Sequence, residues 1–131
     1  KKKIDIYNNG KMYRDFTYID DVVEGVCSLI NKPPSLKQLG KFKNDSLSTI
    51  APFRILNIGN TNKVYLLDFI SAIEKELKTK AKRKYMSLQK GDVKITLSNT
   101  NLLKKITGYN SKTTYKTGIK KFLKWYLNYY N

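Results

Sequence analysis

Strands and helices alternate along this sequence, which predicts an α/β or α+β fold with about four helices and several short strands. Two observations carry this prediction. Short runs of β-branched and aromatic residues end at turn-forming residues, and amphipathic stretches have apolar residues three and four positions apart. The chain has 131 residues, and we expect residues 1–131 to form a single region. A chain of this length buries roughly two thirds of its unfolded surface.

Residues 4–52 are expected to form two strands, a helix and a long loop. Residues 4–7 alternate apolar and polar side chains, and the Asn-Asn-Gly turn at 8–10 separates them from a second strand at about 12–18. A helix at about 20–31 stops before two prolines. The loop at 33–52 is long for a compact domain, so it either has a function or is poorly ordered.

The second part predicts two more strands and three more helices. The near-continuous apolar run 53–58 suits a strand buried on both faces, as in a parallel sheet. Helix 66–78 has one apolar face, and a short strand follows near 84–87. Asn99 or Thr100 can cap a short helix that Gly108 closes.

The last helix is expected at about 114–130, with Thr113 as its cap. We expect most of its aromatic residues to pack in the core, and Trp125 and Tyr130 to be exposed or at an interface.

The segment around Arg14 has the pattern of an anion site. Aromatic and β-branched neighbours favour a strand here, and Asp20 and Asp21 then precede an apolar run, which indicates a helix start. An arginine at the end of a strand beside a helix start suits a planar anion such as a phosphate or diphosphate. The alternative is a surface arginine that pairs with Asp15.

The net charge of the chain suggests a different kind of ligand from the anion site at Arg14. The formal net charge is +16, which would ordinarily suggest nucleic acid or an anionic membrane. Only three of the 26 basic residues are arginine, however, and the lysines are spread over every segment. Because arginine is the preferred side chain for reading phosphates and base edges, we expect no specific nucleic-acid binding, only weak binding at low salt.

Several classes of site are excluded by composition. The chain has no histidine, which rules out an imidazole base and a histidine metal site within it, and Cys27 is its lone cysteine. We expect a buried thiol on a helix face. No stretch approaches the ~20 apolar residues that span a bilayer, and the first residues do not resemble a signal peptide. We therefore expect no membrane partner and a cytoplasmic location.

Eight motifs in order resemble the C-terminal part of an extended short-chain dehydrogenase/reductase that acts on nucleotide sugars, and most closely the UDP-glucuronate 4-epimerases of capsular polysaccharide synthesis. The resemblance covers nearly the whole chain and includes a proline loop particular to that subfamily. Its anchors are Ile4-Asp-Ile-Tyr7, Gly10-Lys-Met12, Arg14-Asp-Phe-Thr-Tyr-Ile-Asp-Asp21, Ala51-Pro-Phe-Arg-Ile55, Asn57-Ile-Gly-Asn60, Leu67-Asp-Phe-Ile70, Gln89-Lys-Gly-Asp-Val93, and Gly118-Ile119 leading to Trp125-Tyr126.

The resemblance implies four substrate-binding residues. Tyr7 matches an aromatic residue beside the uracil, and Arg14 matches the arginine that holds the diphosphate. Gln89 occupies the position where family members that act on other sugars often have a diphosphate-binding arginine. Asp92 matches the carboxylate that accepts hydrogen bonds from the ribose hydroxyls. The alternatives are strand packing for Tyr7, an ion pair alone for Arg14, a solvent-facing turn residue for Gln89, and an Asp-turn for Asp92.

The chemistry of that family needs two motifs, and neither is present here in a form that serves it. This sequence has no glycine-rich dinucleotide turn after a first strand, and its one Tyr-x-x-x-Lys match, Tyr7 to Lys11, runs through the Asn-Asn-Gly turn at 8–10. We therefore expect a UDP-sugar-binding C-terminal fragment that lacks the NAD-binding half. It would have no catalytic or cofactor-binding residues of its own and would be inactive alone, with NAD implied for the full-length parent.

The expected partners are a UDP-sugar and the missing N-terminal NAD-binding half or a partner chain, and a homodimer is left open. The alternatives are a small lysine-rich nucleic-acid-binding protein and a degenerate fragment without a ligand.

Overall fold

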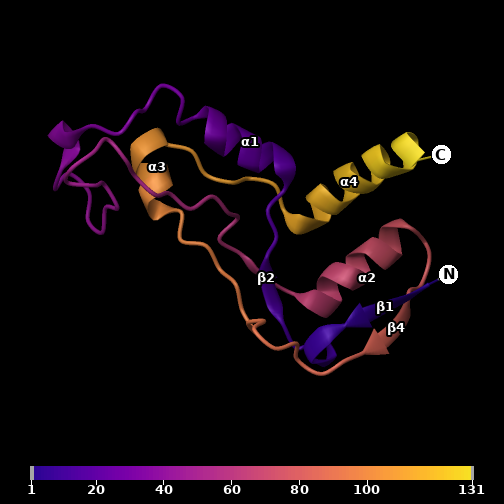
Figure 1. Cartoon of the computed structure of the whole chain (residues 1–131). Helices are drawn as coiled ribbons and strands as arrows, with labels where there is room; N and C mark the ends of the chain where they lie inside the picture. The colour runs from indigo at the N-terminus through magenta and orange to yellow at the C-terminus, as the bar shows by residue number, and fades with distance from the viewer. Residues whose placement is uncertain (1, 131) are drawn as a thin grey trace. The chain divides into compact units, whose positions relative to one another are not determined.

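The computed structural model describes residues 2–130, whose helices and strands are labelled in Figure 1. These residues divide into two units. Unit 1 contains residues 2–16, 62–97 and 113–130, and unit 2 contains residues 17–61 and 98–112. Each unit is thus assembled from segments that lie far apart in the sequence.

Unit 1 has two short pairs of strands. β1 (Lys3–Ile6) runs parallel to β4 (Lys82–Tyr85), with Ile6 opposite Tyr85. β2 (Tyr13–Asp15) runs antiparallel to β3 (Lys63–Tyr65), with Arg14 opposite Val64. The predicted strands at 4–7, 12–18 and 84–87 are therefore present, but they are shorter than expected or shifted by one or two residues.

The turn between β1 and β2 is a 3-10 segment, η1 (Tyr7–Gly10), in left-handed backbone. Asn8, Asn9 and Gly10 have φ values of 49°, 51° and 76°, a region that asparagine and glycine tolerate best. Gly10 is buried, and a Cβ at this position would lie 2.5 Å from Cδ2 of Leu67. Both the conformation and the close approach therefore require glycine here.

Two helices complete unit 1. α2 (Leu66–Glu76) begins directly after β3 and has no side-chain cap. α4 (Tyr115–Tyr130) packs against α2 and buries Ile119 and Leu123. The Thr114 hydroxyl accepts a hydrogen bond from the backbone N–H of Thr117, so this cap lies one residue later than predicted.

The end of α2 is tied to β4 by the buried carboxylate of Glu74. It accepts hydrogen bonds from the backbone N–H of Ala81 at 3.0 Å, from Arg83 at 2.9 Å and from Lys80 at 3.0 Å. The Ala81 N–H, then Arg83 and Lys80, lower the pKa of Glu74 from 4.5 to about 2.

Unit 2 contains α1 (Ile19–Cys27), the 3-10 segment η2 (Leu36–Gln38) and α3 (Asn101–Thr107). The N-cap residue of α3 is Thr100, whose side chain makes no capping hydrogen bond, while the preceding Asn99 side chain accepts a hydrogen bond from the N–H of Asn101. The helix ends at Gly108, which has a φ of 77°, as predicted from the sequence. Buried apolar side chains of this unit are those of Leu47, Leu103 and Tyr109.

α1 contacts the rest of unit 2 through its polar face. The Tyr109 hydroxyl donates to the Asp21 carbonyl at 2.6 Å, and the Ser111 hydroxyl donates to the Asp21 carboxylate at 2.7 Å. Gly25 is close to Tyr109 and Ile58. Burial, with the nearby Asp21 charge, raises the pKa of Tyr109. Three apolar side chains of α1 consequently remain exposed, those of Ile19, Val23 and Val26, whereas Val22 is half-buried.

The long loop at 33–52 is organised around Arg54. Its guanidinium binds both carboxylate oxygens of Asp45, at 2.9 and 3.0 Å, and the Gln38 side-chain oxygen at 3.2 Å. Arg54 and Asp45 have side chains only 3% and 8% exposed. A bidentate, largely buried pair of this kind gives the loop a defined conformation without regular secondary structure.

Three predictions about packing were wrong. No strand forms at 53–58, and Ile55 is 63% exposed, because the run has no strand partner in the described chain. Cys27 is exposed, because α1 turns its polar face inward. In α4 several aromatic residues besides the two expected ones are exposed; they are Phe122, Tyr126 and Tyr129.

Within residues 2–130, no helix is long and apolar enough to cross a membrane. The same residues contain no cluster of three or more histidine, cysteine or carboxylate side chains suited to a metal ion.

The Glu74 contacts predict a pH-dependent stability. Because the folded-state pKa of about 2 lies below the ordinary 4.5, the ionised carboxylate stabilises the folded state above pH 4.5 and this contribution disappears as the pH falls towards 2. We expect Glu74→Gln to lower the free energy of unfolding at pH 7, and the difference from wild type to shrink between pH 4.5 and 2. Urea unfolding followed by Trp125 fluorescence measures this.

The matched control is Asp5→Asn, because Asp5 is exposed and lies 3.9 Å from Lys84. It should leave the stability profile nearly unchanged. If Glu74→Gln and wild type lose stability in parallel over the whole acid range, the assigned role of Glu74 is wrong.

The Gly10 turn predicts a large effect for a small substitution. Gly10→Ala should destabilise the chain by on the order of 2–4 kcal/mol, since it combines left-handed strain with overpacking against Leu67. Gly40→Ala is the control, because Gly40 has a φ of 74° with nothing within 4 Å, and it should cost only about 1 kcal/mol. Equal losses in urea unfolding would contradict the close contact.

Candidate functional site

β2 is held by hydrogen bonds on both of its edges. On one side it pairs with β3. On the other, the Tyr13 N–H donates to the Lys94 carbonyl at 2.9 Å, and the Thr96 N–H donates to the Tyr13 carbonyl at 3.2 Å. This second contact brings the segment after residue 92 alongside β2, although the two segments are about 80 positions apart in the sequence.

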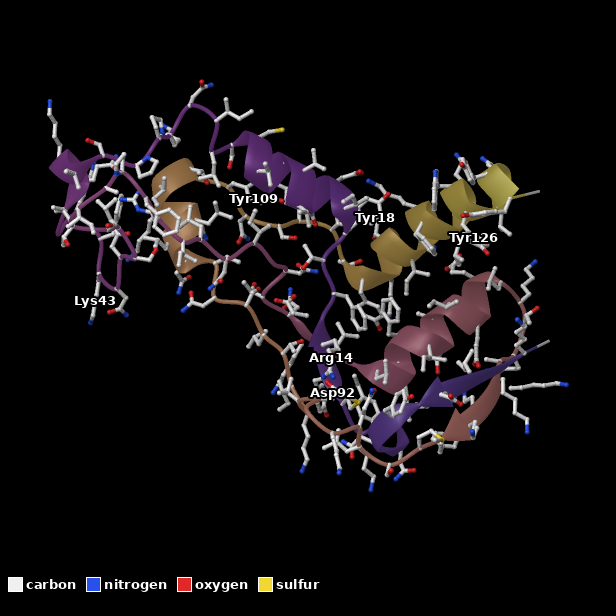
Figure 2. All side chains as sticks on the ribbon, viewed as in Figure 1. Arg14, Tyr18, Lys43, Asp92, Tyr109 and Tyr126 are labelled. Carbon is white, nitrogen blue, oxygen red and sulfur yellow. The ribbon has the colours of Figure 1, made fainter. Side chains whose placement is uncertain are left out.

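Arg14 projects from the middle of β2 and meets Asp92 (Figure 2). Its Nη2 donates to Oδ1 of Asp92 at 2.8 Å, and its Nη1 donates to the Tyr13 carbonyl at 2.9 Å. The side chains of Arg14 and Asp92 are 22% and 33% exposed. The ion pair of Arg14 is therefore formed with a second predicted site residue, and not with Asp15 as in the alternative from sequence.

Gln89 and Asp92 occupy the two ends of one tight turn. The Asp92 N–H donates to the Gln89 carbonyl at 3.2 Å, and Gly91, at the third position of the turn, has a φ of 81°. Glycine is the residue that this position favours. Gln89 is exposed, so its side chain is accessible from the solvent at the start of the turn that ends in Asp92.

Tyr7 lies in the same unit, where β1 passes into η1. The Met86 N–H donates to the Ile6 carbonyl and the Asn9 N–H donates to the Met86 carbonyl, both at 2.9 Å. These bonds hold the Tyr7 turn next to the chain that leads from β4 to Gln89. Tyr7 is half-buried, which leaves part of its ring accessible.

The side chains of this site suit recognition of an anion and of hydroxyl groups. A guanidinium offers a planar set of donors to phosphate oxygens, and a carboxylate accepts hydrogen bonds from hydroxyls. In the described residues, neither Nε of Arg14 nor Oδ2 of Asp92 has a protein hydrogen-bond partner. Both groups thus keep unused bonding capacity beside their mutual contact.

Sequence reasoning missed the contact between Arg14 and Asp92, and it missed the backbone groups that share it. Asp92 Oδ1 also accepts from the Val93 N–H at 2.8 Å. Nothing in the local sequence of either segment indicates these partners, because they depend on how the strands are arranged.

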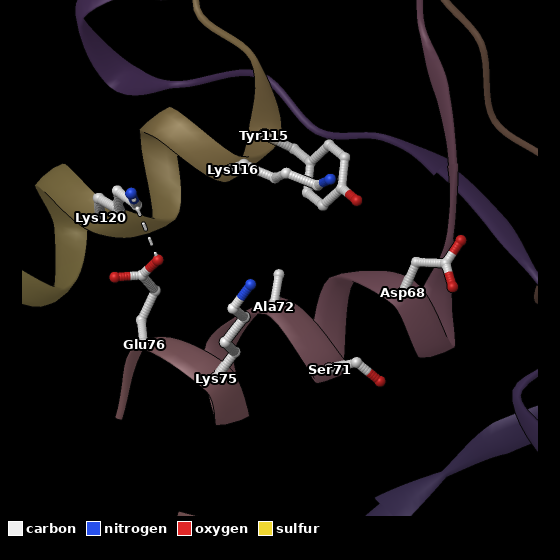
Figure 3. Close-up of a pocket in the computed structure, with 8 residues that line it drawn as sticks. All are labelled: Asp68, Ser71, Ala72, Lys75, Glu76, Tyr115, Lys116 and Lys120. Atoms are coloured by element: carbon white, nitrogen blue, oxygen red, sulfur yellow. Dashed lines mark ion pairs between the residues drawn. The ribbon is translucent and has the colours of Figure 1, made fainter. Parts of the chain in front are cut away.

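Cavities occur elsewhere in the chain as well. One of about 480 Å³ lies between α2 and α4 of unit 1 (Figure 3), where Lys120 approaches Glu76 at 3.7 Å. Another of about 590 Å³ lies in unit 2, beside the start of α3. Neither is lined by any of the four predicted substrate-binding residues, so the Arg14–Asp92 surface is a different site.

Sequence comparison finds relatives that match nearly all of this chain. It is 44% identical to the protein CapI of Staphylococcus aureus over 128 residues, which are 97% of the chain and 38% of CapI. It is 38% identical to a probable UDP-glucuronate 4-epimerase of Rhizobium meliloti and 40% identical to UDP-glucuronate 4-epimerase 3 of Arabidopsis thaliana, covering 95% of the chain in each case. No protein-family model matches.

Comparison with solved structures also finds nucleotide-sugar epimerases. A UDP-glucuronic acid 4-epimerase from Bacillus cereus aligns with a TM-score of 0.75 over 98% of this chain and 36% of its own length, at 22% identity. A UDP-glucose 4-epimerase from Thermotoga maritima aligns with a TM-score of 0.77 over 99% of this chain and 36% of its own, at 18% identity. The fold is therefore that of a part of a Rossmann-type nucleotide-sugar epimerase.

Sequence identity shows which nucleotide-sugar enzymes this chain is related to. The chain is homologous to the C-terminal part of the UDP-glucuronate 4-epimerases and CapI. It spans 38% of the length of CapI and 37% of the length of the Rhizobium relative. The family resemblance predicted from the eight motifs is confirmed.

Proposed function

We propose that this chain is the UDP-sugar-binding part of an NAD-dependent nucleotide-sugar 4-epimerase of the UDP-glucuronate/UDP-galacturonate type. The observation that carries the proposal is the meeting of Arg14 with Asp92 beside the Gln89 turn. A donor for phosphate and an acceptor for hydroxyls thus lie next to each other, as the diphosphate and the ribose do in a nucleoside diphosphate.

Each residue of the site has a role in this proposal. Arg14 binds the diphosphate through its remaining N–H groups, and Asp92 accepts from the ribose hydroxyls through Oδ2. Gln89 adds an amide donor near the diphosphate. Tyr7 gives a flat surface beside the uracil, where an aromatic ring provides contact area at low entropic cost.

We propose that catalysis takes a further part that this sequence does not contain. The sequence has no glycine-rich dinucleotide turn, and its one Tyr-x-x-x-Lys match, Tyr7 to Lys11, spans the η1 turn, where Asn8 and Asn9 have left-handed backbone. The exposed apolar face of α1 supports the need for further protein, because contiguous exposed apolar surface usually marks an interaction site. An NAD-binding half, in the same polypeptide or in a second chain, is the partner we propose. A homodimer and a cytoplasmic location remain predictions.

Nucleic-acid binding is not supported by the comparisons, which find epimerases among the relatives. The net charge of +16 arises from scattered lysines, a distribution that gives weak, salt-sensitive binding in place of specific recognition.

Thermal unfolding with added ligands tests the proposal. At ~150 mM salt, millimolar UDP and UDP-glucuronate should raise the melting temperature, since a ligand at ten times its Kd stabilises the folded state by about 1.4 kcal/mol. Arg14→Ala should abolish this shift, while the control Lys11→Ala, at an exposed position, should keep it. Neither NAD retention nor epimerase turnover is expected from this chain alone.

Stabilisation by single-stranded DNA without any effect of UDP would contradict the proposal. A shift with UDP that survives Arg14→Ala would place the nucleotide elsewhere on the chain.

A further inference from the structure

We propose that Asp92 positions the Arg14 guanidinium for a diphosphate, in addition to any contact that Asp92 makes with the ligand. This inference rests on the proposed function. It predicts that the affinity for the diphosphate depends on Asp92, although Asp92 itself is proposed to contact the ribose.

Two fixed contacts define the orientation of the guanidinium. Nη2 of Arg14 donates to Oδ1 of Asp92 at 2.8 Å, and Nη1 donates to the Tyr13 carbonyl at 2.9 Å. Both acceptors are themselves held. The Tyr13 carbonyl also accepts from Thr96 N–H, and Oδ1 of Asp92 accepts from Val93 N–H at 2.8 Å. A long side chain bound at two points loses its freedom before the ligand arrives.

The contact leaves one donor of Arg14 and one acceptor of Asp92 without a protein partner. In the described chain, Nε of Arg14 and Oδ2 of Asp92 have no protein hydrogen-bond partner. The pair is also partly exposed, at 22% and 33% for the two side chains. A phosphate can therefore approach Arg14 without breaking the bond to Asp92.

A simple charge argument gives the opposite expectation, which makes the inference testable. A carboxylate beside an arginine reduces the local positive potential and should weaken the binding of an anion. If Asp92 acts only through its charge, any substitution that removes the charge should strengthen anion binding. If Asp92 acts as an anchor, a substitution that removes its hydrogen-bond acceptor should weaken it.

Two substitutions of Asp92 separate these effects. Asp92→Asn removes the charge but keeps an Oδ1 that can accept from Arg14 and Val93. Asp92→Ala removes both the charge and the acceptor. Inorganic pyrophosphate is the probe, because it has the diphosphate chemistry and no ribose for Asp92 to contact. Arg14→Ala and Asp5→Asn are the controls, the second for loss of an exposed carboxylate in the same unit.

The measurement is a titration of the full chain with pyrophosphate at ~150 mM salt, followed by amide NMR shifts. We expect Asp92→Asn to bind as tightly as wild type or more tightly, and Asp92→Ala to bind about tenfold more weakly than Asp92→Asn, the effect of one lost charge-assisted hydrogen bond. Asp5→Asn should resemble wild type, and Arg14→Ala should show no saturable binding.

A second measurement needs no ligand. The ¹⁵N relaxation of Nε in Arg14 should indicate a rigid side chain in wild type and in Asp92→Asn, and a mobile one in Asp92→Ala. The amide spectrum of each variant shows that it is folded, so increased mobility confined to Arg14 supports the anchor.

The outcomes distinguish the two proposals. Equal pyrophosphate affinity and equal Arg14 mobility in Asp92→Ala and Asp92→Asn overturn the positioning role alone. Pyrophosphate binding by wild type that is unaffected by Arg14→Ala, or that is absent, overturns the anion site and with it the proposed function.

Discussion

The position of β2 between two backbone partners is the constraint on which the site depends. β3 pairs with one edge, and the segment beginning at residue 94 bonds to Tyr13 on the other. Backbone hydrogen bonds fix the register, and a shift by one residue would turn Arg14 to the opposite face. The ion pair with Asp92 is thus a consequence of register: the ladder sets the distance, and the charges then stabilise an arrangement that the backbone has already selected.

The exposed surfaces of the chain agree with its partial span of the relatives. α1 buries Asp21 and Gly25 and exposes its apolar stripe, while the apolar run at 53–58 forms no strand. Both features are unfavourable for a chain surrounded by water, because neither removes its apolar surface from the solvent. The chain spans 38% of CapI, and the NAD-binding half that we propose would cover these surfaces.

Features governed by local chemistry could be predicted from the sequence. The Gly108 stop of α3 follows from the backbone preference of glycine, and the apolar spacing indicated α2. Features that depend on distant partners could not. Periodicity located the apolar face of α1 but could not say that the opposite face is the covered one, so Cys27 was expected to be buried. In the site, local chemistry predicted an anion-binding role for Arg14, whereas its contact with Asp92 depends on strand pairing across 78 positions.

The central claim is that the nucleotide binds on unit 1 at the Arg14–Asp92 surface. Mapping of UDP-glucuronate on the ¹⁵N-labelled chain by amide chemical shifts tests it most directly. The account predicts that the shifts concentrate at Tyr7, Arg14 and the turn from Gln89 to Asp92, and saturate with ligand. Shifts concentrated in unit 2, or at the cavity between α2 and α4, would contradict it.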